Sequence, residues 1–154
     1  MNWAEIELTG WGRSSRARTR ACRPERLGEL GLALAQAVHA GEPILAHGAG
    51  RSYGDAALNS GGRTVLTGRL DRLLAFDPAS GILVCEPGVT FGDLIEVFLP
   101  LGFMAPASPG TAFATLGGAL ANDVHGKNHD RHGSFGDHVA WFDLLGADGE
   151  WRRV

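Results

Sequence analysis

Two glycine-rich stretches constrain this chain more than any other feature. The first, HGAGRSYGD at residues 47–55, follows a short apolar run, and the second, PGTAFATLGG, spans residues 109–118. Glycine accounts for 23 of 154 residues, about twice its usual share. Because glycine lacks a Cβ atom, such backbone can lie very close to a ligand or to another segment. The sequence therefore predicts two loops in close contact with something.

The first loop does not fit the dinucleotide-binding turn of a Rossmann fold. Its glycines are spaced G-x-G-x-x-x-G rather than G-x-G-x-x-G, and no long helix follows. Its backbone N–H groups can still bind a phosphate, and Arg51, Ser52 and Tyr53 add donors. The alternative is a tight turn that carries a surface arginine.

The second loop runs into a predicted helix over residues 116–123, with Thr115 as its cap. The first turn of a helix offers free N–H groups and the positive end of the dipole to an anion. Two such loops suggest one pyrophosphate bound from two sides. The alternative is two unrelated loops.

The remaining pattern predicts an α+β fold. Leu27, Leu30, Leu34 and Val38 recur at helical spacing, so we expect a helix that opens at Pro24 and stops at Gly41. A second helix should begin at the capping box of Thr90 and Asp93 and end near Pro100. Strands are predicted at 43–47, 64–67, 73–77, 82–86 and 138–145, with 73–86 as a hairpin.

Composition narrows the class of protein. With 44% hydrophobic residues and a net charge of −3, the chain suits a globular protein and shows no preference for nucleic acid. Cys22 and Cys85 are expected to be reduced packing thiols. No signal peptide or transmembrane segment is visible, which predicts a cytoplasmic location or a peripheral one at the cell envelope.

The two ends of the chain raise separate expectations. Residues 1–22 contain an arginine-rich stretch that we interpret as a solvated N-terminal lead-in. Its alternative is attraction to an anionic membrane surface, where each cation adds about 1 kcal/mol, although no amphipathic face is apparent. At the other end, residues 151–154 start what looks like a partner strand, so we expect a truncated chain or half of a larger architecture.

Several blocks together resemble one known family. They are LTGWGR (8–13), GRSYGD (50–55), EPGVTFGDLIEVFLPLGF (86–103), SPGT (108–111), TLGGALANDVHGKNH (115–129) and GSFGDHV (133–139). The chain is similar to the p-cresol methylhydroxylase-type (PCMH-type) FAD-binding domain of the vanillyl-alcohol oxidase family. The resemblance implies that this domain spans residues 23–154, that FAD lies between two α+β subdomains, and that the C-terminal substrate domain is absent.

The resemblance also implies a role for each block. Its implied cofactor-binding residues are Ala46, His47, Gly48, Ala49, Gly50, Arg51, Ser52, Tyr53, Gly54, Asp55, Ala56, Gly110, Thr115, Leu116, Gly117, Gly118, Asn122, Asp123, Val124 and His125. Some relatives attach FAD covalently through a histidine in an R-S-H segment. Tyr53 occupies the matching position, so we expect FAD to be bound non-covalently.

Four of the six histidines lie in VHGKNHDRHGSFGDH at residues 124–138. Within the resemblance, His125 and Lys127, the only lysine, are the expected catalytic residues on the substrate side of the flavin. His129, His132 and His138 are expected to be solvated bystanders. A metal site is the alternative, but His125 and His129 lack the glutamate and the regular helix of an H-E-x-x-H site, so we predict none.

The function implied is that of an FAD-dependent enzyme acting on the CH–OH group of a sugar. Within the family, the chain resembles the branch that oxidises the 2′-hydroxyl of decaprenylphosphoryl-β-D-ribose in cell-wall arabinan synthesis. Its expected partners are a lipid-linked sugar phosphate as substrate, a reductase or epimerase of the same pathway, and a peripheral membrane contact. The alternatives are an alditol or aldonolactone oxidase, or a truncated FAD-binding module without turnover.

Overall fold

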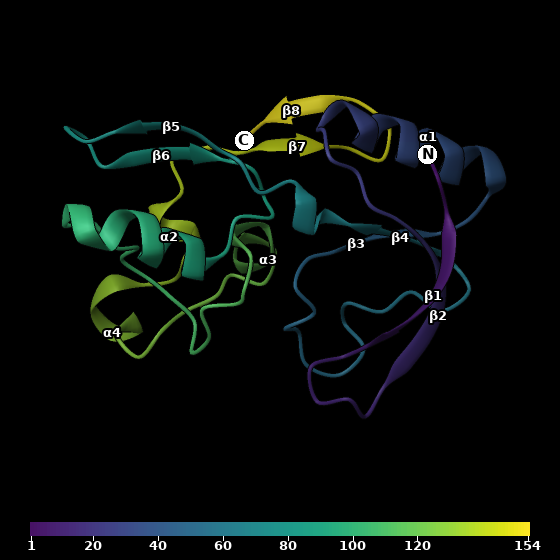
Figure 1. The fold of residues 1–154 in the computed structure, drawn as a ribbon, viewed down its shortest axis with the longest axis horizontal. Helices are drawn as coiled ribbons and strands as arrows, with labels where there is room; N and C mark the ends of the chain where they lie inside the picture. The colour runs from purple at the N-terminus through teal and green to yellow at the C-terminus, as the bar shows by residue number, and fades with distance from the viewer. The chain divides into compact units, whose positions relative to one another are not determined.

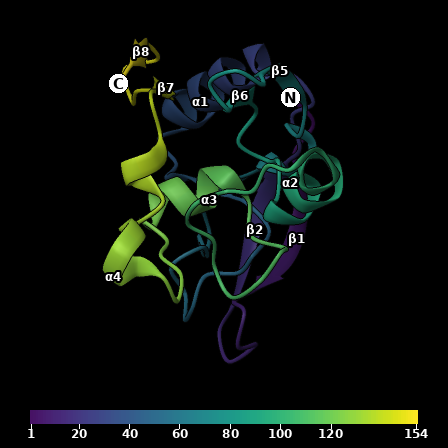
Figure 2. The same ribbon diagram turned by 90° about the vertical axis from the view of Figure 1, so that its left-hand side faces the viewer.

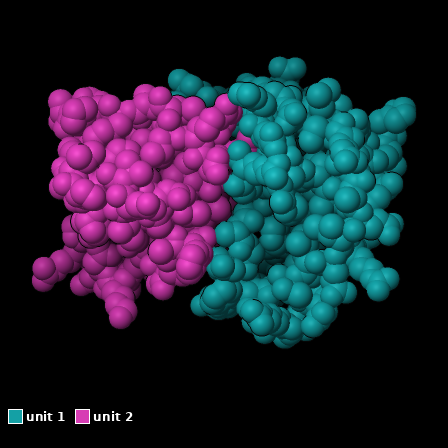
Figure 3. Space-filling model, viewed as in Figure 1, with its two compact units in different colours: residues 1–69, 141–154 teal, residues 70–140 magenta.

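The computed structural model describes all residues from Met1 to Val154. The chain divides into two compact units (Figure 3): unit 1 comprises residues 1–69 and 141–154, and unit 2 comprises residues 70–140. Each unit contains both helices and strands. The predicted α+β class is therefore confirmed.

A four-stranded sheet in the order β1-β2-β4-β3 forms the frame of unit 1 (Figure 1). β1 (Ala4–Thr9) runs antiparallel to β2 (Arg16–Cys22). β4 (Arg63–Leu66) runs parallel to both β2 and β3 (Ile44–His47). The three parallel strands consequently end at the same edge of the sheet.

Strand β2 lies within residues 1–22, the segment interpreted from the sequence as an arginine-rich lead-in. In the sequence RARTRAC, the small residues Ala17, Thr19 and Ala21 are buried, while the three arginines that alternate with them are exposed. Figure 2 shows β1 and β2 side by side. Alternation with a period of two is typical of a strand with one buried face. The small residues carry the pattern, so a search for large apolar residues missed it.

Helix α1 (Gly28–Ala40) covers one face of this sheet. Its Ala33 is fully buried and packs in a core cluster with Cys22 and Val65. The helix begins four residues after the predicted start at Pro24, and it ends at Gly41, whose φ of 66° completes a left-handed cap as predicted. α1 has 13 residues, and no helix in the structure is long and apolar enough to cross a membrane.

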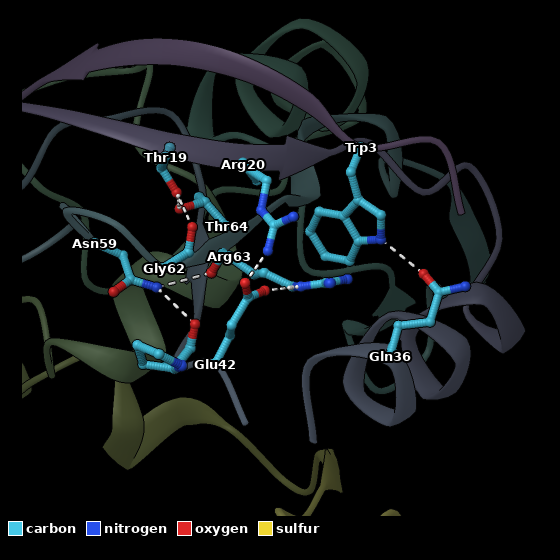
Figure 4. Close-up of polar contacts among 10 residues, drawn as sticks. Trp3, Thr19, Arg20, Gln36, Glu42, Asn59, Gly62, Arg63 and Thr64 are labelled. Atoms are coloured by element: carbon cyan, nitrogen blue, oxygen red, sulfur yellow. Dashed lines mark hydrogen bonds and ion pairs between the residues drawn. The ribbon is translucent and has the colours of Figure 1, made fainter. Parts of the chain in front are cut away.

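Polar side chains join this helix to the sheet (Figure 4). Glu42 forms ion pairs with both Arg20 of β2 and Arg63 of β4. The indole ring of Trp3 lies 4.6 Å from the Arg63 guanidinium and donates a hydrogen bond of 2.6 Å to Gln36 of α1. The N-terminal residues are thereby fixed to both layers of unit 1.

Unit 1 also contains the two-stranded sheet of β7 (Asp143–Leu145) and β8 (Trp151–Arg153). The expected partner strand near the end of the chain is therefore confirmed. The expected strand over 138–145 is shorter than predicted: His138 lies in the 3-10 turn Gly136–His138, and the strand itself spans Asp143–Leu145. The Arg153 Nε donates a hydrogen bond of 2.8 Å to the Asp143 carboxylate. The guanidinium carbon of Arg153 lies 3.8 Å from the centre of the Trp141 ring.

Unit 2 begins with the predicted hairpin of β5 (Leu73–Asp77) and β6 (Ile82–Cys85). The ring of Phe76 lies 4.7 Å from that of Phe98 in α2 (Phe91–Phe98) and 4.9 Å from that of Phe103, which follows the short 3-10 helix Leu99–Leu101. These aromatic contacts hold the hairpin against the helix.

The predicted capping box of α2 is present. The Thr90 hydroxyl accepts a hydrogen bond from the Asp93 N–H at 3.1 Å, and the Asp93 carboxylate accepts one from the Thr90 N–H at 2.8 Å. Each of the two side chains therefore satisfies the backbone N–H of the other residue at the start of α2.

Glu86 is the most deeply buried charged residue, with 1% of its surface exposed. Its carboxylate accepts hydrogen bonds from the backbone N–H of Arg72 at 3.0 Å and from the Arg72 Nε at 2.9 Å, and it forms an ion pair with the same guanidinium. The hydrogen bond to Glu86 raises the pKa of Arg72. The carboxylate joins β6 to the residue just before β5.

The two cysteines carry free thiols. Burial raises the pKa of Cys22, and it raises that of Cys85 to about 11. The thiolate form is therefore scarce at neutral pH. Both residues are reduced packing thiols, as predicted.

Candidate functional site

The glycine loop of unit 1 lies at the edge where the three parallel strands end. Arg23 follows β2, Gly48 follows β3, and the short 3-10 helix Thr67–Arg69 follows β4. In open sheets with parallel strands, ligands bind outside the carboxyl ends. This topology places the loop where a ligand is expected.

A pocket of about 320 Å³ opens at this edge. It is lined by Ile6, Leu8, Arg23, His47, Gly48, Ala49, Leu66, Gly68 and Arg69. Arg69 forms an ion pair with Glu25, whereas Arg23 is exposed and forms no ion pair. The pocket therefore has apolar walls and a basic rim, which suits an organic phosphate.

The backbone of the loop carries unused donors. The N–H groups of residues 48–50 donate no hydrogen bond within the chain. Gly50 and Gly54 have φ values of 65° and 59°, in the left-handed region that favours glycine. The His47 ring beneath the loop is fixed by a 2.8 Å contact between its Nδ1 and the Ala57 carbonyl oxygen. Free N–H groups on glycine backbone beside a cation fit an anionic diphosphate.

Tyr53, Asp55 and Ala56 are exposed at the far end of this loop, and the Tyr53 side chain is 83% exposed. Its neighbour Ser52 has its carbonyl oxygen engaged by the N–H of Trp11 at 3.2 Å. The phenol of Tyr53 is therefore accessible to solvent.

The second glycine-rich loop, in unit 2, differs from its prediction. Thr115 caps α3 (Leu116–Ala121) as expected, through a 3.2 Å hydrogen bond from the Gly118 N–H. The N–H of Leu116 donates a hydrogen bond of 2.8 Å to the Val89 carbonyl oxygen, and the N–H of Gly117 donates one of 2.9 Å to the Pro87 carbonyl oxygen. The first-turn donors expected to bind phosphate are all used within unit 2. Among the expected cofactor-binding residues of this loop, only Gly110 is exposed. A Cβ atom added to Gly110 would have no heavy atom within 4 Å apart from those of its chain neighbours.

Close packing explains the glycine at position 117. A Cβ atom there would lie 2.7 Å from the Pro87 Cβ and 3.0 Å from the Pro87 carbonyl oxygen. No side chain fits that gap. This glycine therefore serves contact between α3 and the segment after β6.

Residues 122–125, the expected flavin-side segment, are tied down by backbone contacts within unit 2. Asp123 has a φ of 44°, and its carboxylate accepts a hydrogen bond from the Gly136 N–H at 3.3 Å. The Val124 carbonyl oxygen accepts one from Phe135 at 2.7 Å, and His125 forms an isolated bridge with Ser134. A left-handed conformation at a non-glycine residue is sparsely populated and often found at functional sites.

The two expected catalytic side chains lie next in the chain. His125 and Lys127 are both exposed, and Lys127 forms no ion pair. Between them, a Cβ atom on Gly126 would lie 2.6 Å from the Ser108 carbonyl oxygen. Glycine at 126 lets the segment pass close to Ser108 while its two neighbours face solvent.

The other histidines of this segment interact with backbone. His129, at the start of α4 (His129–His132), contacts the Gly126 carbonyl oxygen at 3.2 Å through Nδ1. His138 contacts the His132 carbonyl oxygen at 2.6 Å through Nε2. The rings of His125 and His129 are 5.2 Å apart, yet no group of three or more His, Cys, Asp or Glu side chains converges as a metal site.

Sequence reasoning missed Arg23 and Arg69 as pocket residues. Both follow strands that lie parallel in the sheet. Their proximity depends on the pairing of β2 with β4, which are far apart in the sequence. The only local signal was that each arginine directly follows an apolar or small-residue run.

Comparison with known proteins agrees with this geometry. Residues 19–154 match the family described as FAD binding domain. The decaprenylphosphoryl-β-D-ribose oxidase of Mycolicibacterium smegmatis is 37% identical over 148 residues, which cover 96% of this chain and 32% of that protein. The D-lactate dehydrogenase of Anaerostipes hadrus is 26% identical over 109 residues, covering 70% of this chain and 23% of that protein.

Solved structures share the fold. A structure of alkyldihydroxyacetonephosphate synthase matches with a TM-score of 0.77 at 19% identity, over 89% of this chain and 26% of that one. The chain thus spans about a third or less of the length of the proteins it matches. The family match over most of its residues, together with this shared fold, shows that the chain belongs to the FAD-binding domain family.

Proposed function

We propose that this chain is the FAD-binding part of a flavin-dependent oxidoreductase that acts on the CH–OH group of a sugar. One observation carries the proposal: the glycine loop with its unused N–H groups lies beside the basic pocket at the ends of β2, β3 and β4. Membership of the FAD-binding domain family supports FAD as the ligand of this anion site.

Unit 1 would bind the diphosphate of FAD through the N–H groups of residues 48–50, with Arg23 neutralising charge at the rim. The apolar walls of the pocket would exclude water from that contact. Within unit 2, the segment 122–125, which is held by hydrogen bonds inside that unit, is the part of the chain that we assign to the flavin side. When bound, FAD supplies the acceptor for the hydride that leaves the alcohol carbon.

His125 and Lys127 would act on the substrate. Alcohol oxidation requires loss of the hydroxyl proton, and an imidazole can accept it near neutral pH. The Lys127 ammonium is a compact charge that suits a phosphate or a developing anion. Their exposure on a segment braced by Gly126 leaves both side chains accessible to a substrate.

The substrate we favour is a lipid-linked phosphoribose oxidised at its 2′-hydroxyl. The similarity to the decaprenylphosphoryl-β-D-ribose oxidase over nearly the whole chain supports it. The keto product would then require a reductase, the second half of an epimerisation. A lipid-linked substrate also favours work at the periphery of a membrane. The similarity to D-lactate dehydrogenase favours a small 2-hydroxy acid as the second candidate.

Titration of the purified protein with FAD tests the core of this proposal. Binding should perturb the visible flavin bands and quench flavin fluorescence with a one-to-one stoichiometry. Addition of each candidate substrate without oxygen should then bleach the oxidised flavin. Absence of binding would refute the proposed function, and binding without bleaching by any alcohol would identify a module without turnover.

We expect FAD to be released completely by acid denaturation. Tyr53 stands where a histidine would attach to the flavin, and a phenol does not replace imidazole in that bond without different chemistry. Precipitation with acid should leave all yellow colour in the supernatant and a colourless pellet. Flavin that stays with the pellet would contradict non-covalent binding.

Replacement of Arg23 by glutamine is expected to weaken FAD binding about fivefold, because the pocket loses a charge-assisted contact that solvent partly screens. The dissociation constant can be measured by flavin fluorescence at low and high salt, and the loss should shrink as salt rises. Arg26→Gln removes the same charge three residues away and outside the pocket lining, so it serves as the control. Equal losses of FAD affinity in both variants would mean that Arg23 acts only through the net charge of the chain.

A further inference from the structure

The turn between β1 and β2 packs directly on the glycine loop within unit 1. The Trp11 N–H donates a hydrogen bond of 3.2 Å to the Ser52 carbonyl oxygen. A Cβ atom on Gly10 would overlap the Gly54 carbonyl oxygen. The Arg51 guanidinium carbon lies 4.6 Å from the centre of the Trp11 ring. Three contacts therefore join this turn to the loop that we assign to the diphosphate.

We propose that Trp11 is a positioning residue that orients the Arg51 guanidinium toward the diphosphate of the flavin dinucleotide. An arginine side chain loses rotamer entropy when it is fixed in one geometry. An indole ring under the guanidinium restricts it before the ligand arrives, so less entropy is lost on binding. This inference rests on the proposed function of the loop.

The indole is not needed to shape the turn. Trp11 is 47% exposed and lies outside the buried core. Backbone hydrogen bonds close the turn, from Gly10 to Ser15 at 3.2 Å and from Arg13 to Gly10 at 3.0 Å. A substitution at Trp11 should therefore change the ligand site more than the fold.

The test is a double-variant comparison of the dissociation constant for FAD in the whole chain. Trp11→Leu should weaken binding about fivefold, and Arg51→Gln about tenfold. The combined variant should bind like Arg51→Gln alone, because Trp11 acts through Arg51. Trp11→Phe keeps a weaker aromatic face, so its dissociation constant should lie between those of the wild type and Trp11→Leu.

The chain supplies a matched control for the loss of a stacked indole. Trp141 stacks on Arg153 at 3.8 Å, also in unit 1, but this pair belongs to the separate sheet of β7 and β8 rather than to the glycine loop. Trp141→Leu should leave the dissociation constant for FAD unchanged. Melting temperatures without FAD should be the same for Trp11→Leu and the wild type.

Two results would overturn the positioning role while leaving the proposed function intact. One is wild-type affinity in Trp11→Leu. The other is a double variant whose loss equals the product of the two single losses, which would make Trp11 independent of Arg51. A wild-type chain that binds no FAD would instead refute the proposed function, and the positioning role with it.

Discussion

Replacement of Glu86 by alanine is expected to lower the free energy of unfolding by about 3 kcal/mol. The carboxylate is buried and satisfies both the backbone N–H and the guanidinium of Arg72. Alanine would leave that backbone donor without its carboxylate partner and open a cavity beside Val89, which is also fully buried. Chemical denaturation followed by circular dichroism measures the difference.

Two further variants separate burial from charge. Glu25→Ala breaks the exposed ion pair with Arg69 and should cost less than about 1 kcal/mol. Glu86→Gln keeps an acceptor of similar shape, so its loss should fall between those of the two alanine variants. If Glu86→Ala and Glu25→Ala were equally stable, the buried carboxylate would contribute no more than a surface pair.

The second large effect is expected at His125. Under the proposed function, His125→Ala should slow reduction of bound FAD by the sugar substrate about 100-fold, since general base catalysis contributes at least that much. The binding of FAD itself should change little, because the segment is held by the Val124 carbonyl oxygen and the Asp123 carboxylate rather than by the imidazole. Rapid mixing without oxygen measures the rate as the loss of oxidised-flavin absorbance.

His129→Ala is the matched control for this experiment, because its ring lies only 5.2 Å away but contacts the Gly126 carbonyl oxygen. It should retain nearly the wild-type rate. Lys127→Ala should mainly raise the substrate concentration needed for half-maximal rate, as expected for a charge that binds a phosphate. An unchanged rate in His125→Ala would remove this histidine from the mechanism.

Local features of the fold were readable from the sequence. The capping box at Thr90 and Asp93, the hairpin around residues 77–81 and the Gly41 helix stop depend on residues within a few positions of one another. Each has a turn or cap whose conformation few residue types satisfy. Such signals need no knowledge of the rest of the chain.

Features that depend on distant pairing were missed. β2 was not predicted as a strand, because its partner β4 lies more than 40 residues away and its buried side chains are small. The first-turn donors of α3 were predicted to be free, yet Pro87 and Val89 use two of them. A sequence shows that a helix has unpaired N–H groups, but not which segment satisfies them.

The candidate site also combines local features, which the sequence predicts, with features that depend on distant pairing. The glycine loop was identified from its composition, and the structure adds its unused donors. Arg23 and the apolar walls were not identified, because they reach the loop only through the sheet. Trp11 was part of a motif that carried the resemblance, but its stacking on Arg51 is visible only in three dimensions.

The parallel pairing of β2, β4 and β3 also links binding to folding. The pocket exists only when these three strands and β1, which are spread over residues 4–69, are paired in register. A slip of one residue in β4 would turn Leu66 to the opposite face and remove it from the pocket wall. A ligand at this edge therefore binds the folded sheet and not the open chain, and by mass action it stabilises unit 1 in proportion to the logarithm of its concentration.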